Sequence, residues 1–411
     1  MRTLSGWAIV VAATVTGATP AAAQTARVQS AVEALAQDAA EYARAVGVPQ
    51  AEAERRLRAQ ALTRPATLGI ARRFADRLAG VSVEHRPDHR IVVLLTGDAS
   101  VPDEAVDTGE GTTPVVFRTG AHATRVEVLA ALSRHQAAIR AMLPHPPGLG
   151  HDARTGALVV TADPRDVDAI GADELARRVE ALTGVPVRVR ALGRETLDLA
   201  AEGGGRVVGV NPADGRRYAC TTGFVVTDGA RQGVVTAAHC PDALSYVGGD
   251  GAGRRETPLA FLGQWGWGYQ DVQLHLAAEP LRPLFLADTA KSVARPVDAV
   301  LPRDATRAGD WVCHRGESTG YSCAEVEFAD FAPAGDLCGG ACLPTWVAVA
   351  GPTCRGGDSG GPVFVGTVAI GLTKGASYRD GRCGFYFYMS TDFLPTGWSV
   401  ALGGMVPPTA P

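Results

Sequence analysis

The most informative segment of this 411-residue chain is Gly357-Asp358-Ser359-Gly360-Gly361-Pro362-Val363, in its last third. A serine between glycines lies on sharply bent backbone, which exposes its hydroxyl and the neighbouring N–H groups. The same letters satisfy G-x-S-x-G, the nucleophile elbow of the α/β-hydrolases, in which the histidine of the triad follows the serine along the chain. No histidine follows Ser359 in the sequence, so this interpretation is excluded. Any base for this serine must lie upstream.

Upstream of Ser359, the best candidate base is His239. It follows the extended apolar run Val234-Val235-Thr236-Ala237-Ala238, whose small last residues suit an imidazole at the floor of a cleft. The best candidate acid between the two is Asp271, which begins an alternating strand pattern within residues 268–274. The three residues therefore stand along the chain in the order His, Asp, Ser.

These residue types are what nucleophilic catalysis by serine requires. A serine hydroxyl is a poor nucleophile near neutral pH until a base takes its proton, and the imidazole needs a buried carboxylate to fix its tautomer and to stabilise the imidazolium. The order found here is that of the chymotrypsin fold and differs from subtilisin, in which Asp precedes His. We therefore predict a catalytic triad of His239, Asp271 and Ser359.

Other ionisable residues have plainer interpretations. Asp288 and Asp298 lie in the same window as Asp271, but their neighbours are typical of turns or strand ends. For His275, four residues after Asp271, we predict a packing role. The histidines of the first half are scattered without the close spacing of metal ligands, at positions 85, 89, 122, 135, 145 and 151. We therefore predict no metal site and no cofactor.

Two motifs together resemble the chymotrypsin-like serine peptidases: T-A-A-H-C at 236–240 and G-D-S-G-G-P at 357–362. Two further segments favour the bacterial branch that includes α-lytic protease and the streptogrisins. Residues 312–323 resemble the small disulfide loop of that branch, and Gly371-Leu372-Thr373-Lys374-Gly375 resembles its substrate-binding strand. The resemblance covers about residues 205–400.

The resemblance implies an all-β catalytic domain of two six-stranded antiparallel β-barrels, with the active site between them. The backbone N–H groups of Gly357 and Ser359 would form the oxyanion hole. Substrate would pair as an extended strand along the predicted substrate-binding residues, which are Thr373, Lys374, Gly375 and Ala376. In the streptogrisin pattern a serine is common at the position of Lys374 and a glycine at that of Ala376. We expect these two side chains to narrow the specificity pocket.

A second departure concerns the buried aspartate before the nucleophile, here Asp358. Relatives often carry an arginine that pairs with it, and we expect His314 or the adjacent Arg315 to take that place. The segment Ala350-Gly351-Pro352-Thr353 offers no carboxylate to the base of the specificity pocket. We therefore expect a neutral residue before the scissile bond.

The cysteines divide the chain, because the first 219 residues have none and the last 192 have all eight. An even count confined to one half of an exported chain is typical of disulfides. Cys338-Gly339-Gly340-Ala341-Cys342 looks like half of a zinc site, but no second half with suitable spacing exists. The residues alone leave the pairing open, and the family pattern implies these pairs: Cys220–Cys240, Cys313–Cys323, Cys354–Cys383 and Cys338–Cys342.

The first half of the chain predicts an export signal and an α+β region. Residues 1–23 have one basic residue, a short apolar stretch and a final Ala-Ala-Ala, which is typical of a cleaved signal peptide and predicts secretion. Helical periodicity at 28–46 and 124–142, and a strand-helix-strand pattern over 157–192, predict an α+β region over 24–204. This region resembles the large pro-region of the bacterial branch, which acts as folding catalyst and inhibitor.

After Gly203-Gly204-Gly205 the pattern changes to short β-branched runs between glycines and prolines. The change predicts an all-β peptidase domain over 205–400, followed by a Pro-containing tail at 401–411. Maturation is expected near 202–207, and two routes are open. The large pro-region favours self-cleavage, whereas Arg206-Val207 faintly resembles a trypsinogen activation site.

The composition excludes several classes of protein and limits the kinds of binding partner that we expect. The chain is 46% apolar and 20% charged, which excludes a disordered chain or a coiled coil. Its formal net charge of -4, without a concentrated basic patch, favours neither nucleic acid nor a membrane as partner. We expect a secreted, monomeric serine endopeptidase made as a zymogen, with protein or peptide substrates and its own pro-region as partners. The alternative is a catalytically silent binding protein on the same fold.

Overall fold

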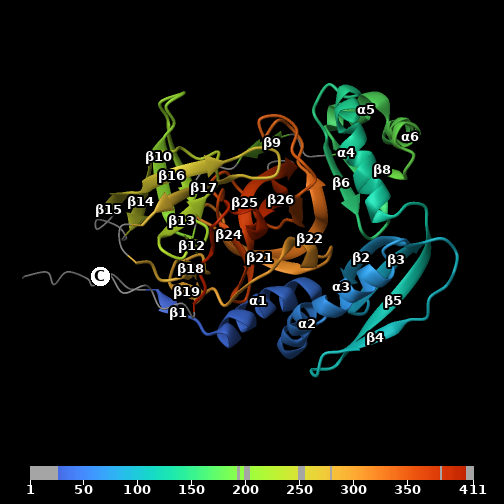
Figure 1. The fold of residues 1–411 in the computed structure, drawn as a ribbon, viewed down its shortest axis with the longest axis horizontal. Helices are drawn as coiled ribbons and strands as arrows, with labels where there is room; N and C mark the ends of the chain where they lie inside the picture. Colours follow the sequence, from blue (N-terminus) through green and yellow to red (C-terminus); the bar gives the residue numbers. More distant parts are fainter. Residues whose placement is uncertain are drawn as a thin grey trace, which may run out of the picture.

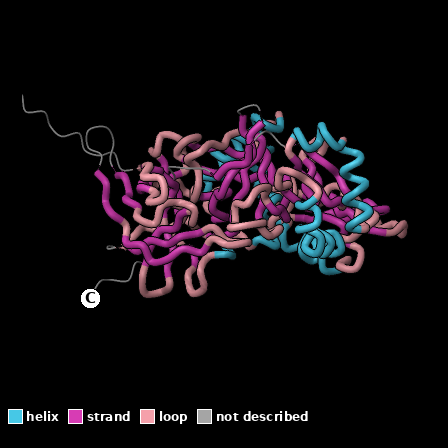
Figure 2. Tube along the Cα trace, turned by 90° about the horizontal axis from the view of Figure 1, so that it is seen from above, coloured by secondary structure: helices cyan, strands magenta, loops and turns pink. Residues whose placement is uncertain are grey.

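The computed structural model describes residues 26–191, 195–198, 204–248, 255–277, 280–379 and 382–403. The predicted signal peptide at 1–23 lies outside these ranges, as do residues 202–203 of the predicted maturation region and 404–411 of the predicted tail. Within these ranges, no helix is both long enough and apolar enough to cross a membrane. Viewed from above, the helices gather toward one end of an elongated molecule, and strands run along most of its length (Figure 2).

The N-terminal part contains three helices and a four-stranded sheet, followed by three further helices with a second group of strands (Figure 1). In chain order its elements are β1 (Arg27–Val28), α1 (Ala31–Val46), α2 (Gln50–Leu62), α3 (Arg64–Arg73), β2 (Leu78–Glu84), β3 (Arg90–Thr96), β4 (Glu104–Asp107), β5 (Thr112–Ala121), α4 (Arg125–Ala141), β6 (Gly148–Asp152), β7 (Ala157–Ala162), α5 (Pro164–Ile170), α6 (Ala172–Thr183), β8 (Val187–Ala191) and β9 (Glu195–Asp198). The strand-helix-strand pattern predicted for 157–192 is present, and its strands β7 and β8 pair in parallel.

The two helices predicted from periodicity begin at capping boxes. The Ser30 hydroxyl accepts the N–H of Glu33, and the Glu33 carboxylate accepts the N–H of Ser30 at 2.8 Å. Thr124 and Glu127 repeat the arrangement at the start of α4. Each box satisfies backbone donors that the first turn leaves unpaired. The caps therefore fix helix starts that periodicity alone places within a few residues.

The C-terminal barrel is a closed ring of six antiparallel strands, in the order β21-β24-β25-β26-β23-β22, with β22 returning to β21. Its strands are β21 (Trp311–Gly316), β22 (Gly320–Ala332), β23 (Trp346–Ala350), β24 (Pro362–Val365), β25 (Val368–Arg379) and β26 (Arg382–Ser390). Buried side chains such as Val347, Val363 and Tyr388 fill one of its cores. Closure leaves neither edge of the sheet unpaired.

The preceding barrel is also a ring of six, because two of its strands bend and join a four-stranded to a five-stranded sheet. Its elements are β10 (Arg206–Val210), β11 (Arg217–Thr221), β12 (Val225–Thr227), β13 (Gln232–Thr236), β14 (Leu244–Gly248), β15 (Arg255–Pro258), β16 (Ala260–Trp265) and β17 (Val272–Leu276). β11 and β12 are two halves of a strand bent at 222–224, and β15 and β16 meet at Leu259. Gly223 suits the first bend, because a Cβ there would lie 2.9 Å from the backbone oxygen of Gly360. The predicted pair of six-stranded barrels is confirmed.

Short elements connect the two barrels and follow the second barrel. They are β18 (Leu284–Leu286), β19 (Val293–Pro296), β20 (Ala299–Val300), the 3₁₀ turns Arg303–Ala305 and Thr391–Phe393, and β27 (Ser399–Val400). β27 pairs with β12, which ties the end of the chain to the first barrel. The four expected disulfides are all present: Cys220–Cys240, Cys313–Cys323, Cys338–Cys342 and Cys354–Cys383.

Three strands of the N-terminal part pair with strands of the C-terminal part. β1 runs parallel to β19, β6 is antiparallel to β22, and β9 is antiparallel to β25. β6 carries β7 and β8 with it, so the sheet of the second barrel continues into the N-terminal part (Figure 1). The sequence did not indicate these pairings.

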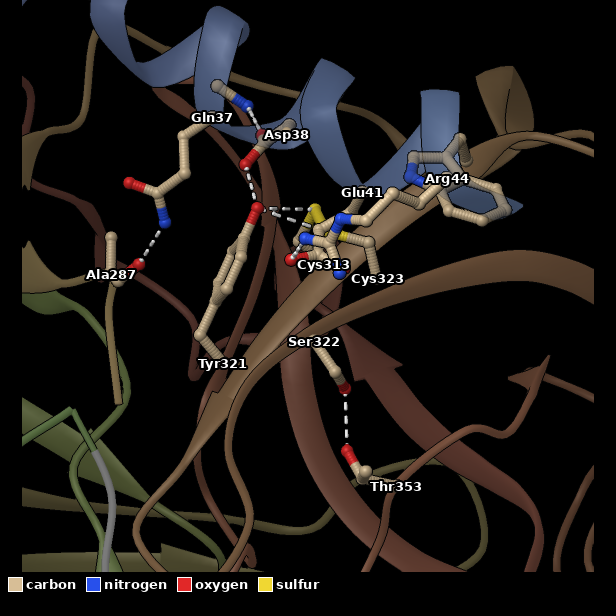
Figure 3. The surroundings of a disulfide bond; sticks show 12 residues. Gln37, Asp38, Glu41, Arg44, Ala287, Cys313, Tyr321, Ser322, Cys323 and Thr353 are labelled. Atoms are coloured by element: carbon tan, nitrogen blue, oxygen red, sulfur yellow. Dashed lines mark hydrogen bonds and ion pairs between the residues drawn. A yellow bond between two sulfur atoms is a disulfide. The ribbon is translucent and has the colours of Figure 1, made fainter. Parts of the chain in front are cut away.

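Helix α1 inserts a buried carboxylate into the C-terminal part (Figure 3). Asp38 is fully buried and pairs with Arg295, which is also fully buried, at 2.9 Å between Oδ1 and Nη1. It also accepts the Tyr321 hydroxyl and the Gly366 N–H, each at 2.6 Å. The Tyr321 hydroxyl in turn lies 3.1 Å from a sulfur of the Cys313–Cys323 disulfide. The ion pair therefore joins the two parts through a fully desolvated contact.

Candidate active site

The structure brings His239, Asp271 and Ser359 into one hydrogen-bonded line. The His239 Nε2 lies 2.8 Å from the Ser359 Oγ, and its Nδ1 lies 2.8 Å from the Asp271 Oδ2. The other carboxylate oxygen accepts the backbone N–H of His239 at 3.1 Å. With the carboxylate at Nδ1, the neutral ring carries its proton there and leaves Nε2 as the acceptor for the serine proton.

Strand pairing brings the base and the acid together. His239 follows β13 and Asp271 immediately precedes β17, and these strands pair with Thr236 opposite Gln273. The Gln273 amide donates to the Ala237 carbonyl at 3.0 Å, which anchors the segment between β13 and His239. The end of one strand and the start of its neighbour therefore hold the two side chains on the same side of the first barrel.

Ser359 lies in a tight turn before β24 and is fully buried. Its carbonyl accepts the N–H of Thr221, and the Gly360 N–H donates to the Thr373 carbonyl at 2.7 Å. Gly360 has φ +82°, and a Cβ there would lie 2.3 Å from the Thr221 oxygen. Only glycine fits this close approach, which is the physical reason for the glycine after the serine.

The predicted oxyanion hole lies in the same turn. Gly357 has φ +127°, a backbone conformation that favours glycine and sets the direction of the adjoining peptide groups. The Asp358 N–H between the two predicted donors bonds to the Arg355 carbonyl at 3.2 Å. The assignment of the Gly357 and Ser359 N–H groups to an oxyanion stays a prediction.

The carboxylate of Asp358 is held by the loop between β21 and β22. It accepts the N–H groups of Ser318 and Thr319 at 3.2 Å, the Thr319 hydroxyl at 2.8 Å and the Arg355 N–H at 2.9 Å. His314, one of the two expected partners, contacts the Thr319 hydroxyl at 3.4 Å. Burial outweighs these bonds and raises the pKa of Asp358 to about 6. Sequence reasoning missed Ser318 and Thr319, whose only signal is their place inside the small disulfide loop.

The charge state of Asp271 depends on burial and on two neighbouring side chains, His239 and Lys374. Asp271 is 3% exposed, and burial raises the pKa of its carboxyl group. The neighbouring His239 and Lys374 lower this pKa by more than burial raises it, so the net shift is downward. The Lys374 Nζ lies 3.3 Å from the same Oδ2 that accepts from His239. The acid is therefore held as a carboxylate.

The predicted substrate-binding strand is β25, and it is already paired. Gly375 to Tyr378 pair with Asp198 to Glu195 of β9, so a segment of the chain itself lies where an extended substrate is expected. Ala376 is fully buried in the core of the second barrel. Thr373 is 2% exposed, and its N–H donates to the Gly361 carbonyl.

The expectation that Lys374 narrows the specificity pocket needs correction, because its side chain lies against Asp271 instead. The β25–β26 register shifts between Thr373 and Gly375, so Lys374 is the extra residue of a β-bulge. A bulge re-aims the side chain that it carries. The expectation came from the streptogrisin pattern, in which a serine is common at this position, and that pattern does not show where a lysine side chain at the bulge points.

The remaining ionisable candidates take structural places. His275 is fully buried, packs edge-on against the Phe261 ring at 5.6 Å, and has a pKa lowered to about 4, mainly by burial. Asp288 accepts the N–H groups of Ser292 and Val293, as a turn residue does. Among the residues that the structure describes, potential metal ligands gather at Asp38, Cys313 and Cys323, where the two sulfurs are bonded to each other.

Comparison with known proteins points the same way as the geometry. No protein-family model matches this chain. Streptogrisin-D of Streptomyces griseus is 29% identical over 231 residues, which are 55% of this chain and 53% of that protein, so the chain spans about half the length of this curated relative. Among solved structures, a glutamic acid specific serine protease has 22% identity and a TM-score of 0.39, over 49% of this chain and 100% of that one. Thermobifida fusca Protease A has 22% identity and a TM-score of 0.36, over the same shares. By its two barrels, its motifs and its streptogrisin match, the chain resembles the bacterial chymotrypsin-like serine proteases.

Proposed function

We propose that this protein is a serine endopeptidase that cleaves peptide bonds through an acyl-enzyme on Ser359. The observation that carries the proposal is the contact of the Ser359 Oγ with the His239 Nε2 at 2.8 Å, while Nδ1 faces a buried carboxylate. His239 takes the hydroxyl proton as the oxygen attacks the carbonyl carbon, and then gives it to the leaving amine. Water deacylates the serine by the same route, and Asp271 stabilises the imidazolium in both halves.

We propose further that the chain is made as a secreted zymogen, with residues 24–204 as the pro-region. The β9 strand on β25 supports this, because it occupies the strand on which substrate is expected to pair. It ends at Asp198, a few residues before the maturation region at 202–207. After cleavage there, β9 would be the end of the released pro-region and would bind like a product. The four disulfides favour an oxidising compartment.

The expected preference for a neutral residue before the scissile bond also belongs to this proposal. Its support is the segment Ala350–Thr353, which contributes no carboxylate. A peptide library incubated with the matured protein tests it. Cleavage mainly after Arg or Lys would contradict the preference and leave the peptidase proposal intact.

The activity is tested by the intact mass of the exported wild type beside Ser359→Ala, with Ser399→Ala as a control at an exposed serine. Wild type and Ser399→Ala should lose the N-terminal half, and Ser359→Ala should stay long. A fluorophosphonate probe should label the first two at Ser359. Trimmed wild type that resists the probe would favour the alternative, a silent binding protein on this fold.

A further inference from the structure

Lys374 is an unusual neighbour for a triad. Its side chain is 2% exposed, and its ammonium group lies 3.3 Å from the Asp271 Oδ2. The same oxygen lies 2.8 Å from the His239 Nδ1, so two donors share this oxygen. The ammonium group also lies 5.3 Å from the centre of the Trp346 ring, within the range of a cation–π contact.

Burial of the Lys374 ammonium group costs free energy, and the residues around it compensate for that cost. A buried ammonium group is destabilising unless an anion compensates it, and here Asp271 does so. The chain has only two lysines, Lys291 and Lys374, and otherwise uses arginine as its cation. The bulge at Lys374 turns the side chain of a strand residue out of the ladder and toward Asp271.

Charge governs what Lys374 does to the base. The charged groups facing Asp271 are His239, at the end of β13, and Lys374, from β25. From β26, the neutral Met389 sulfur accepts the Asp271 N–H at 3.3 Å. The Lys374 ammonium group partly neutralises the Asp271 carboxylate, which then stabilises a protonated His239 ring less. The ammonium group also repels a protonated His239 ring directly. Both effects favour the neutral form of His239.

We propose that Lys374 is a positioning residue of the triad, which holds the Asp271 carboxylate in place and keeps His239 neutral, and therefore able to accept a proton, at lower pH than Asp271 alone would allow. The proposal rests on the proposed serine peptidase activity. It concerns a residue that touches neither substrate nor the reacting atoms through its side chain, so its effect must appear in the pH dependence of turnover.

The test compares matured wild type with Lys374→Met, which keeps length and apolar volume but removes the charge, and with Lys374→Ser, which keeps a donor without charge. Lys291→Met is the matched control, since Lys291 pairs with Glu317 on the surface side of the loop. In Lys374→Met, the acid midpoint of kcat/KM should rise by about one pH unit. Its kcat should fall by about tenfold while KM changes less than about twofold. Lys374→Ser should show the same rise in midpoint with a smaller loss of kcat.

An unchanged acid midpoint in both Lys374 variants, with Lys291→Met also unchanged, would overturn the inference. Failure of the peptidase proposal looks different, because wild type itself would then resist the fluorophosphonate probe at every pH. If the Lys374 variants do not accumulate, the histidine signal that Ser359→Ala perturbs can be titrated by NMR in the wild type. A His239 midpoint below about 6.5 supports the inference, and one at about 6.5 or above overturns it.

Discussion

Asp271 pairs with both His239 and Lys374, so its removal should cost both catalysis and stability. Asp271→Asn keeps the shape of the side chain but favours the wrong tautomer of His239, and it leaves Lys374 without its carboxylate partner. We expect kcat/KM to fall by about 10⁴-fold. We also expect the free energy of unfolding to fall by about 3 kcal/mol, the usual cost of breaking a buried ion pair.

Probe labelling rates and thermal unfolding check the two effects separately. Asp288→Asn is the control, because Asp288 caps a loop outside the triad. An Asp271→Asn protein with full stability would show that Lys374 does not depend on this carboxylate.

For single residues, the sequence predicts which side chains belong to the candidate site better than it predicts where those side chains point. His239, Asp271 and Ser359 have flanking letters that restrict the backbone, such as the glycine at 360 that only a close approach explains. The direction of the Lys374 side chain depends on a register shift between β25 and β26, and nothing in the local sequence marks it. The donors to Asp358 depend on loop geometry in the same way.

Helix α1 is the element that ties the N-terminal part to the barrels, and Asp38 is its buried contact. Asp38→Ala would leave the Arg295 guanidinium without this carboxylate and the Tyr321 and Gly366 donors without their acceptor. We expect the uncleaved Ser359→Ala background to lose about 3 kcal/mol of stability, enough to lower its Tm by several degrees. Differential scanning fluorimetry measures this, with exposed Asp168→Ala as control. An equal Tm for the two variants would contradict the role of the ion pair.

Strand β9 is the element that we expect to hold the chain in its own substrate site. Leu197 lies opposite Ala376, and proline at 197 removes a backbone donor from the strand, whereas alanine keeps it. We expect Leu197→Pro to mature about tenfold more slowly than Leu197→Ala, because β9 no longer aligns the cleavage region. A time course of intact mass after synthesis measures this. Equal rates would show that pairing along β9 does not guide cleavage.

Among the helices and strands, α1 and α4 can be predicted from local signals in the sequence, which are periodicity and capping boxes. The β-bulge and the corners of the barrels do not, and neither do the pairings of β1, β6 and β9. Each of these joins segments far apart along the chain, where the partner strand and its register are decided by packing. The two barrels were predicted through a family resemblance and not from periodicity.

Across the whole molecule, buried and half-buried histidines make stability depend on pH. Burial is the main cause that lowers the pKa of five of them: His85, His89, His151, His275 and His314. His89 has a pKa of about 3, and His275 and His314 have pKa values of about 4. An unfolded histidine binds a proton near pH 6.5, so the unfolded chain takes up more protons than the folded one below that pH. Burial raises the pKa of Asp358 to about 6 and also raises the pKa of Asp38, so these two carboxyl groups oppose the histidines.

The lowered pKa values of these histidines predict that the uncleaved chain loses stability in acid. Each lowered histidine contributes stability that is present above about pH 6.5 and is lost as the pH falls toward its folded pKa, at up to about 1.4 kcal/mol per unit. We expect the Tm of uncleaved Ser359→Ala to drop by about 5 °C or more between neutral pH and about pH 4.5. His89→Gln should flatten this slope, because it removes a half-buried ring whose pKa is lowered to about 3, whereas the matched control His122→Gln changes an exposed histidine. His85 lies buried at the contact between the two parts, where its Nε2 bonds the Gly309 carbonyl and its Nδ1 faces the Tyr42 hydroxyl. Protonation adds a buried charge and a proton at Nδ1, so acid should also loosen the N-terminal part from the barrels. A Tm that rises on acidification over this range would mean that the carboxyl groups with raised pKa values, Asp38 and Asp358, and not the histidines, set the pH dependence.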